Sequence, residues 1–250
     1  MEVITSRQNN IIRHIRKLAG DRKYRRNCGE FLCEGPKMLA EAEHWGFVPQ
    51  TILACDELLL HAWEGLATHT VLVDADLLAY AADTETPQGL IFTCKIPETL
   101  DKLPGERLLV LDGVQDPGNV GTILRTADAF GADGVVLLPG CADPWSPKVV
   151  RSTMGACFRI PVMARTLEEL AAMLNEQNIP LYATALRDDT QDIRQVSLCR
   201  AAVVIGSEGK GVSEQVLNLC EMTLKIPMTE QCESLNAAMA AGIVLWESFR

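Results

Sequence analysis

The sequence predicts an α/β protein in which a smaller α/β domain precedes a larger C-terminal domain with a parallel sheet. Short apolar runs rich in β-branched residues, such as residues 201–205, are typical of buried parallel strands. Segments with apolar residues at helical spacing separate these runs along the chain. Glycine or proline follows several runs, as in the three glycines of residues 206–211. Alternation of this kind predicts helices packed on sheets.

We predict that residues 1–95 form the smaller domain. It opens with a basic stretch in which Ile11, Ile12, Ile15 and Leu18 recur at helical spacing, so one helix face should be buried. Strands are expected at residues 30–34, 51–55, 71–73 and 91–94, and helices at residues 36–45, 56–63 and 75–82. Residues 96–106 contain two prolines and no periodicity, and we interpret them as a linker.

We predict that residues 107–250 form the larger domain. Strands are expected at residues 108–111, 134–138, 159–162, 181–184, 201–205 and 222–226, and helices at residues 120–130, 149–156 and 167–176, after Ser213 and from Ala237. Asn119 could cap the helix that follows it. Because parallel α/β sheets bind ligands at the carboxyl ends of their strands, the loops after residues 205 and 226 form the candidate site.

Composition limits the classes of function. The chain has 250 residues, of which 48% are hydrophobic, and contains no apolar run of membrane-spanning length. Its polar N-terminus lacks a signal-peptide core. The nine cysteines are odd in number and show no C-x-x-C spacing, which supports neither a zinc cluster nor a disulfide framework. We therefore expect a cytoplasmic protein with reduced thiols, no metal and no membrane partner.

The charge distribution matters more than the net charge of −10. Residues 1–37 contain nine Lys or Arg and four acidic residues, which makes this segment basic in an acidic protein. Local basic patches determine phosphate contacts. We expect the exposed cations of this segment to bind nucleic acid, and the alternative is a solvated helix face. The candidates are Arg22, Lys23, Arg25 and Arg26.

The glycine-rich segment 206–211 does not match the common phosphate-binding loops. Gly211 follows Gly209 and Lys210 where a Walker A loop has Ser or Thr. The glycine spacing is G-x-x-G-x-G, whereas the dinucleotide motif is G-x-G-x-x-G. Residue patterns alone thus predict a binding loop without identifying its ligand.

Three motifs in this order resemble those of the SpoU family of RNA ribose 2′-O-methyltransferases, within the SPOUT superfamily. They are LDGVQDPGNVGTILRTA from Leu111, IGSEGKGVS from Ile205, and IPM…ESLNAAMAAG from Ile226. One departure is Glu230, where a glycine is expected. Residues 1–95 resemble the L30e-like substrate-binding domain of many such enzymes, through SRQN, the basic stretch, EFLCEG and PQG.

The resemblance implies S-adenosylmethionine as the methyl donor, held by the backbone around Gly206, Ile226 and Leu235. Thr184, at a neighbouring strand end, is a further candidate from its position. Arg125 matches the family's catalytic arginine. We expect it to grip the target phosphate and stabilise the developing alkoxide; the alternative is a general base, although guanidinium groups stay protonated in proteins.

Further polar positions match the family and should orient Arg125, the ribose or the loops. They are Asn119, Glu208, Ser234 and Asn236. Two of these residues could instead have purely structural roles. Glu208 could be a solvated loop acid, and Ser234 could be only a helix N-cap with Asn236 in the first turn.

The resemblance also implies a deep trefoil knot and a homodimer formed through it, for which the tail GIVLWESF is a suitable interface. The expected substrate is a structured RNA, ribosomal rather than transfer RNA. The alternatives are a tRNA 2′-O-methyltransferase or a catalytically inactive knotted RNA-binding protein. A dimerising or structural N-terminal domain, and a nucleotide-dependent metabolic enzyme, are the non-RNA alternatives.

Overall fold

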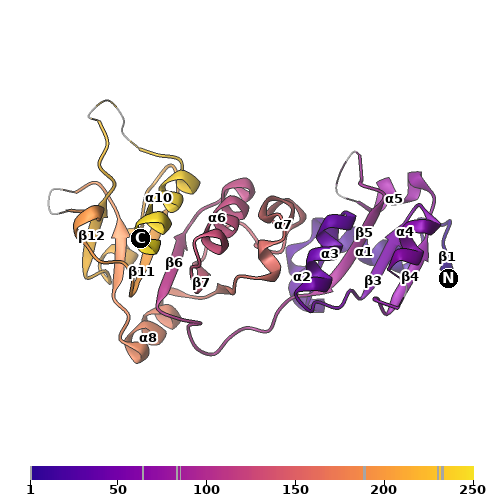
Figure 1. The fold of residues 1–250 in the computed structure, drawn as a ribbon, viewed down its shortest axis with the longest axis horizontal. Coiled ribbons are helices and arrows are strands. Elements are labelled where there is room, and N and C mark those ends of the chain that lie inside the picture. The colour runs from indigo at the N-terminus through magenta and orange to yellow at the C-terminus, as the bar shows by residue number, and fades with distance from the viewer. Residues whose placement is uncertain are drawn as a thin grey trace. The chain divides into compact units, whose positions relative to one another are not determined.

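The computed structural model describes residues 2–63, 65–82, 84, 86–187, 190–229, 231 and 234–250, and it divides the chain into two compact units (Figure 1). Unit 1 comprises Met1–Glu98 and Asp143–Phe158, and unit 2 comprises Thr99–Ala142 and Arg159–Arg250. Residues 143–158, which lie inside the predicted larger domain, therefore pack with unit 1. Glu230 lies outside the described residues.

Unit 1 is built on a five-stranded mixed sheet in the order β1-β4-β3-β5-β2. Strands β1, β4 and β3 are parallel, and β5 is antiparallel to both β3 and β2. The central strands β3 and β5 are buried along their length except at Lys95, as their mostly apolar sequences predict. The strands are β1 (Glu2–Val3), β2 (Glu30–Glu34), β3 (Thr51–Ala54), β4 (His69–Leu72) and β5 (Leu90–Lys95).

The basic stretch forms two helices, α1 and α2, because Asp21 ends one and begins the other. Its carboxylate Oδ1 accepts a hydrogen bond from the Tyr24 amide at 2.9 Å, which is the bond of an N-cap. The predicted apolar face of α1 is confirmed, since Ile12, Ile15 and Leu18 are fully buried. The helices that precede unit 2 are α1 (Asn10–Gly20), α2 (Arg22–Cys28), α3 (Pro36–His44), α4 (Glu57–Ala62) and α5 (Ala75–Ala81).

The later segment Asp143–Phe158 completes the core of unit 1. It contains helix α7 (Pro147–Thr153) and a 3₁₀ turn at Ala156–Phe158. The Trp145 ring lies 4.9 Å from that of Phe31 on β2, and the Phe158 ring lies 4.9 Å from that of Phe47. These aromatic contacts bury apolar surface that residues 1–98 would otherwise expose.

Unit 2 contains a seven-stranded sheet that is parallel throughout, in the order β10-β12-β9-β11-β6-β7-β8, so the predicted parallel sheet is confirmed. Strand β8 begins at Val162, later than predicted, because Pro161 has no amide for a ladder bond. The strands are β6 (Arg107–Asp112), β7 (Gly134–Leu137), β8 (Val162–Ala164), β9 (Leu181–Thr184), β10 (Gln191–Asp192), β11 (Ala201–Gly206) and β12 (Met222–Lys225).

Helices α6 and α10 pack against each other, and α10 also contacts β6 and β11 (Figure 1). Gly242 of α10 faces Thr126 of α6, so the predicted use of small residues for close packing is confirmed. The remaining helices of unit 2 are α8 (Leu167–Gln177), α9 (Glu214–Leu217) and a 3₁₀ turn at Ile193–Gln195. Helix α6 spans Pro117–Ala129 and α10 spans Ala237–Phe249.

The predicted N-cap at Asn119 is wrong, and so is the alternative in which Ser234 caps α10. Helix α6 starts before Asn119, because Asp116 is the N-cap and Pro117 occupies the first turn, an arrangement favoured by the fixed φ of proline. At α10 the N-cap is Asn236, which accepts hydrogen bonds from the amides of Ala238 and Met239. Ser234 is therefore outside the helix. No helix in the described part of the chain has the length and apolar character needed to cross a bilayer.

Candidate active site at the strand ends of unit 2

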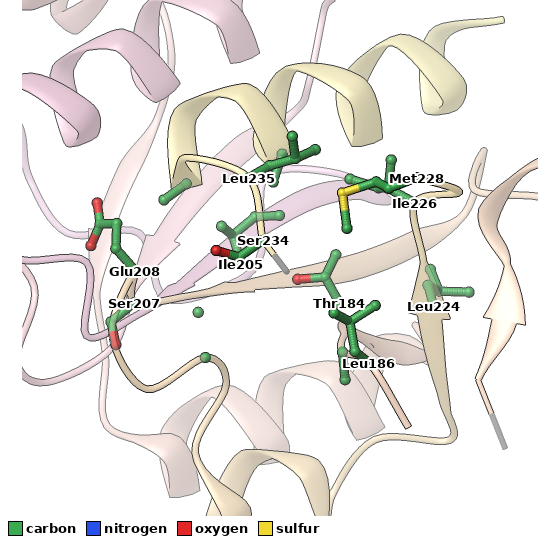
Figure 2. Close-up of a pocket in the computed structure, with 15 residues that line it drawn as sticks. Thr184, Leu186, Ile205, Ser207, Glu208, Leu224, Ile226, Met228, Ser234 and Leu235 are labelled. Carbon is green, nitrogen blue, oxygen red and sulfur yellow. The ribbon is translucent and has the colours of Figure 1, made fainter. Parts of the chain in front are cut away.

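A cavity of about 300 Å³ opens where β9, β11 and β12 end in unit 2 (Figure 2). The strands are parallel, so their carboxyl ends meet at one edge of the sheet, where ligands of such folds bind. The four residues predicted to hold a cofactor all line this cavity: Thr184, Gly206, Ile226 and Leu235. Two predicted catalytic residues, Glu208 and Ser234, line it as well.

The cavity has apolar walls and one acidic end. Figure 2 shows Ser207 and Glu208 at one end, and Leu186 and Leu224 at the opposite end. The lining residues that the structure describes include one carboxylate and neither Lys nor Arg. Apolar walls suit a flat aromatic base, and a carboxylate without a neighbouring cation suits a positive charge. A cationic, adenosine-containing cofactor therefore fits the residues present.

Gly206 ends β11 and allows the next loop to fold back onto it. A Cβ at this position would lie 2.1 Å from the carbonyl carbon of Gly211 and 2.2 Å from the amide nitrogen of Val212. Two backbone hydrogen bonds between Ser207 and Gly211, of 3.1 and 2.9 Å, close this loop. The glycine was predicted to permit close approach of a ligand, but its immediate neighbour is the chain itself.

One hydrogen-bonded chain joins three of the predicted polar residues. The Asn119 side-chain amide donates to Oε1 of Glu208, and the Asn236 amide donates to Oδ1 of Asn119 at 3.1 Å. Each residue comes from a different sequence motif and a different loop or helix start. Glu208 is thus a hydrogen-bonded member of the site, which answers the alternative of a merely solvated acid.

Arg125 lies apart from this chain of hydrogen bonds. It is exposed on α6, about one and two-thirds turns after Asn119, and is not among the residues lining the cavity. Its guanidinium makes no hydrogen bond or ion pair with the residues that the structure describes. The positive charge is therefore available to an anion from outside the chain.

Other residues complete the site without having been predicted. Oδ2 of Asp112, at the end of β6, accepts a hydrogen bond from the Ser213 amide at 2.7 Å and so ties the loop after β11 to its neighbouring strand. Leu186 and Met228 line the cavity. The signal that could have identified all three is their position, at or just beyond the end of a parallel strand.

Cys220 lies two residues before β12 and is not among the residues that line the cavity. Burial raises the pKa of Cys220 to about 12, and the charge of Asp112 adds to the effect, so this residue stays a neutral thiol at neutral pH. Within the described ranges, no group of three His, Cys, Asp or Glu side chains could hold a metal ion.

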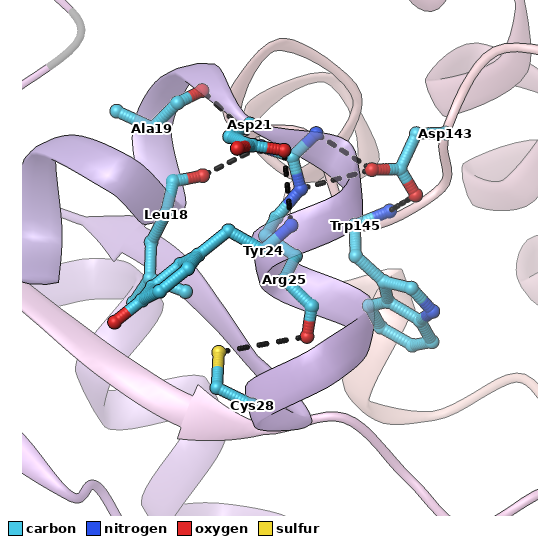
Figure 3. A network of polar contacts seen from close by, with 8 residues as sticks. All are labelled: Leu18, Ala19, Asp21, Tyr24, Arg25, Cys28, Asp143 and Trp145. Atoms are coloured by element: carbon cyan, nitrogen blue, oxygen red, sulfur yellow. Dashed lines mark hydrogen bonds and ion pairs between the residues drawn. The ribbon is translucent and has the colours of Figure 1, made fainter.

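One of the four cations predicted to bind nucleic acid is buried. Arg22, Lys23 and Arg26 are exposed on α2, but Arg25 is only 4% exposed. Its Nε and Nη2 donate to Oδ2 of Asp143 at 2.9 and 2.6 Å, and its Nη1 donates to the carbonyls of Leu18 and Ala19 (Figure 3). The prediction for Arg25 is wrong, because its donors satisfy the open carbonyls at the end of α1 and a buried carboxylate.

Comparisons with known proteins agree along the whole chain. Residues 106–246 match the SpoU rRNA Methylase family, and residues 9–91 match the MRM3-like substrate binding domain. The chain is 36% identical to the 23S rRNA (guanosine(2553)-2′-O)-methyltransferase RlmP of Bacillus subtilis, with 98% of each protein covered. It is 32% identical to the 23S rRNA (uridine(2479)-2′-O)-methyltransferase of Streptomyces viridochromogenes, covering 99% of this chain and 91% of that protein.

A solved structure resembles the whole chain. The crystal structure of the SpoU methyltransferase AviRb from Streptomyces viridochromogenes, in complex with the cofactor AdoMet, superposes with a TM-score of 0.89 at 28% identity. The alignment covers 97% of this chain and 98% of that one. Both units therefore have counterparts in one cofactor-bound relative.

Proposed function

The chain belongs to the SpoU rRNA methylase family, and from this premise we propose that it transfers a methyl group from S-adenosylmethionine to a ribose 2′-hydroxyl of ribosomal RNA. The observation that carries the proposal is the cavity of unit 2, whose lining residue Glu208 is joined by hydrogen bonds to the polar residues of the two other motifs. The two relatives whose names specify 2′-O-methylation of 23S rRNA align with nearly the whole chain, which favours ribosomal over transfer RNA as the substrate.

The bound S-adenosylmethionine supplies a methyl group already activated by its sulfonium. The protein then mainly has to align the two reactants, and correct alignment alone can remove a large part of the activation barrier. Leu224, Ile226 and Leu235 form the apolar walls, and the loop after Gly206 closes the acidic end. Glu208 supplies the negative charge that suits a cationic ligand.

As the new O–C bond forms and the S–C bond breaks, S-adenosylhomocysteine would leave with the electron pair of that bond, and the hydroxyl proton would pass to water. We assign to Arg125 the stabilisation of the developing oxygen anion and the grip on a neighbouring phosphate. Its charge is permanent and its donors are open to an incoming anion. The hydrogen bonds from Asn236 through Asn119 to Glu208 join the starts of α10 and α6 to the loop after β11, and this intact set argues against a catalytically inactive RNA-binding protein.

Assembly and topology are part of the proposal. We infer a trefoil knot, supported by the path of the chain, which leaves β12 and returns to pack α10 against α6, β6 and β11. We also infer a homodimer through α10. Trp246 and Phe249 are 50% and 56% exposed, and their rings lie 5.7 and 5.9 Å from that of Phe130. Such an aromatic patch is typical of an interface. The odd number of cysteines and their lack of C-x-x-C spacing support reduced thiols and a cytoplasmic location.

The test combines cofactor binding with methyl mapping. Purified protein should gain thermal stability with S-adenosylmethionine but not with NAD or ATP, by about 2.7 kcal/mol at a hundredfold excess over Kd. With the cofactor, it should add one 2′-O-methyl group to a 23S rRNA transcript, located by alkaline hydrolysis and sequencing. Transfer to tRNA alone would overturn the ribosomal assignment, and cofactor binding without any transfer would favour the inactive alternative.

A further inference from the structure

A second cationic feature of unit 1 is centred on Tyr80 of α5 and does not involve the exposed cations of α2. The guanidinium carbons of Arg7 and Arg16 lie 4.5 and 5.0 Å from the centre of the Tyr80 ring. Arg7 precedes α1, Arg16 is on α1, and Tyr80 is on α5. Three separate segments thus bring two arginines to the same aromatic ring. A guanidinium held over a tyrosine ring is attracted by the negative face of the ring.

Both arginines are exposed, and neither is neutralised within the described part of the chain. No carboxylate there forms an ion pair with Arg7 or Arg16, including Asp76, which lies one turn before Tyr80 on α5. Two permanent positive charges are therefore held at one ring, and their N–H donors make no hydrogen bond to the residues that the structure describes. This arrangement leaves a local positive potential inside a protein whose net charge is −10.

The next residue of α1, Lys17, also lies beside a tyrosine ring. Nζ of Lys17 lies 5.1 Å from the centre of the Tyr24 ring, and the Tyr24 hydroxyl hydrogen-bonds to Nδ1 of His14 at 2.9 Å. Tyr24 and Tyr80 both pack against the apolar core of unit 1, so both platforms are fixed. We refer to Arg7, Arg16, Lys17, Tyr24 and Tyr80 as the tyrosine–cation surface.

We propose that the tyrosine–cation surface binds the phosphate backbone of the RNA substrate, an inference that rests on the proposed function. Phosphates are matched by the planar fork of arginine, which can form two parallel hydrogen bonds to one group. Stacking on tyrosine restricts each guanidinium beforehand, so less conformational entropy is lost on binding. A backbone site of this kind positions the RNA without reading its sequence.

The test is the salt dependence of binding to a 23S rRNA transcript, measured for Arg7→Gln/Arg16→Gln. Each lost phosphate contact lowers the log–log slope by about 0.7–0.9, so the double variant should lose roughly 1.4–1.8. Its KM for RNA should rise, while kcat at saturating RNA and affinity for S-adenosylmethionine stay near those of the wild type. Tyr80→Leu, which changes no charge, should also weaken binding, whereas Tyr80→Phe should not.

The matched control is Lys37→Gln/Lys148→Gln, which removes the same charge from two exposed positions of unit 1. An equal fall in slope for both double variants would show only a diffuse field and overturn the proposal. So would an unchanged slope in Arg7→Gln/Arg16→Gln. If the wild type transfers no methyl group to RNA, the proposed function itself fails, and this result is separate from either binding outcome.

Discussion

Asn119 connects residues that are 89 and 117 positions away in the sequence, because its amide both donates to Glu208 and accepts from Asn236. An amide used in both directions has little freedom to rotate, and linked hydrogen bonds strengthen one another. Asn236 has two functions, since its Oδ1 also caps α10. These functions can be separated by substitution.

Asn236→Asp keeps the capping oxygen and loses the amide donor to Asn119. We expect its stability to stay within about 0.5 kcal/mol of the wild type, because a carboxylate is a good N-cap. Methyl transfer should fall up to about tenfold, which corresponds to one lost hydrogen bond. Asn236→Ala should lose transfer and about 1 kcal/mol of stability as well. Urea unfolding and single-turnover assays measure the two effects. Wild-type transfer by Asn236→Asp would reduce this residue to a cap.

Arg125→Ala should lose methyl transfer while keeping its affinity for S-adenosylmethionine. The residue lies outside the cavity lining, and a cation gains nothing near a sulfonium of like charge. Loss of an electrostatic donor to a developing oxyanion costs on the order of 10²–10³ in turnover. Arg125→Lys should rescue poorly, because a point charge lacks the planar fork. Single-turnover transfer at saturating RNA, beside calorimetric cofactor titration, decides it; near wild-type transfer would exclude the role.

At the scale of elements, the loop after β11 provides a matched pair of glycines. Gly206→Ala places a Cβ against the backbone of residues 211 and 212, so the loop must move, at a cost of about 1–3 kcal/mol. We expect it to lose the thermal stabilisation by S-adenosylmethionine. Gly209→Ala meets nothing within 4 Å and should keep it. Thermal unfolding with and without the cofactor compares them, and equal cofactor responses would contradict the role of Gly206.

The buried ion pair between Arg25 and Asp143 connects α2 to the segment 143–158, and we expect its loss to lower the stability of the protein. Arg25→Gln leaves a buried carboxylate unpaired, which costs on the order of 3–5 kcal/mol. Arg25→Gln/Asp143→Asn should recover part of that loss, and the exposed neighbour Arg26→Gln should stay within about 0.5 kcal/mol of the wild type. Urea unfolding followed by tryptophan fluorescence measures the series. Equal midpoints for Arg25→Gln and Arg26→Gln would show that the pair contributes nothing.

The elements with a strong local signal were predictable from the sequence. Strands β9 and β11 are continuous apolar runs, and their predicted positions agree with the structure to within one residue. The two-residue strands β1 and β10 were missed because Glu2–Val3 and Gln191–Asp192 carry no pattern, and only their pairing with β4 and β12 makes them strands. The burial of Arg25 was unpredictable for the same reason, since its partner lies 118 residues away.

The sequence predicted which residues form the site better than it predicted the tertiary contacts around them. The motifs identified part of the cavity lining, Gly206, Ile226 and Leu235, and the polar chain of Asn119, Glu208 and Asn236. They could not show that Gly206 packs against its own loop, because that contact depends on how the chain folds back. They also could not assign residues 143–158 to unit 1, since the aromatic contacts of Trp145 and Phe158 are set by tertiary packing.

At the scale of the whole molecule, the proposed homodimer predicts that one charge introduced on α10 weakens the dimer. Trp246→Lys places a charge in the aromatic patch of α10, which should shift the protein toward monomers, because a buried unpaired charge is costly. Trp45→Lys makes the same change at a 49% exposed tryptophan of unit 1 and should leave the dimer intact. Sedimentation velocity over a range of concentrations distinguishes them. A dimer that persists in Trp246→Lys would place the interface elsewhere.

The membership of Asp143–Phe158 in unit 1 affects the order in which a ribosome can release folded parts. Trp145 and Phe158 emerge long after Glu98, the last residue of the first stretch of unit 1. At about 5–20 residues per second, the roughly 60 intervening residues take about 3–12 s to synthesise. During that time Phe31 and Phe47 lack their ring partners, and the nascent unit exposes an apolar face to chaperones. Protease sensitivity of ribosome-bound chains, stalled before and after this segment has left the exit tunnel, would time the event.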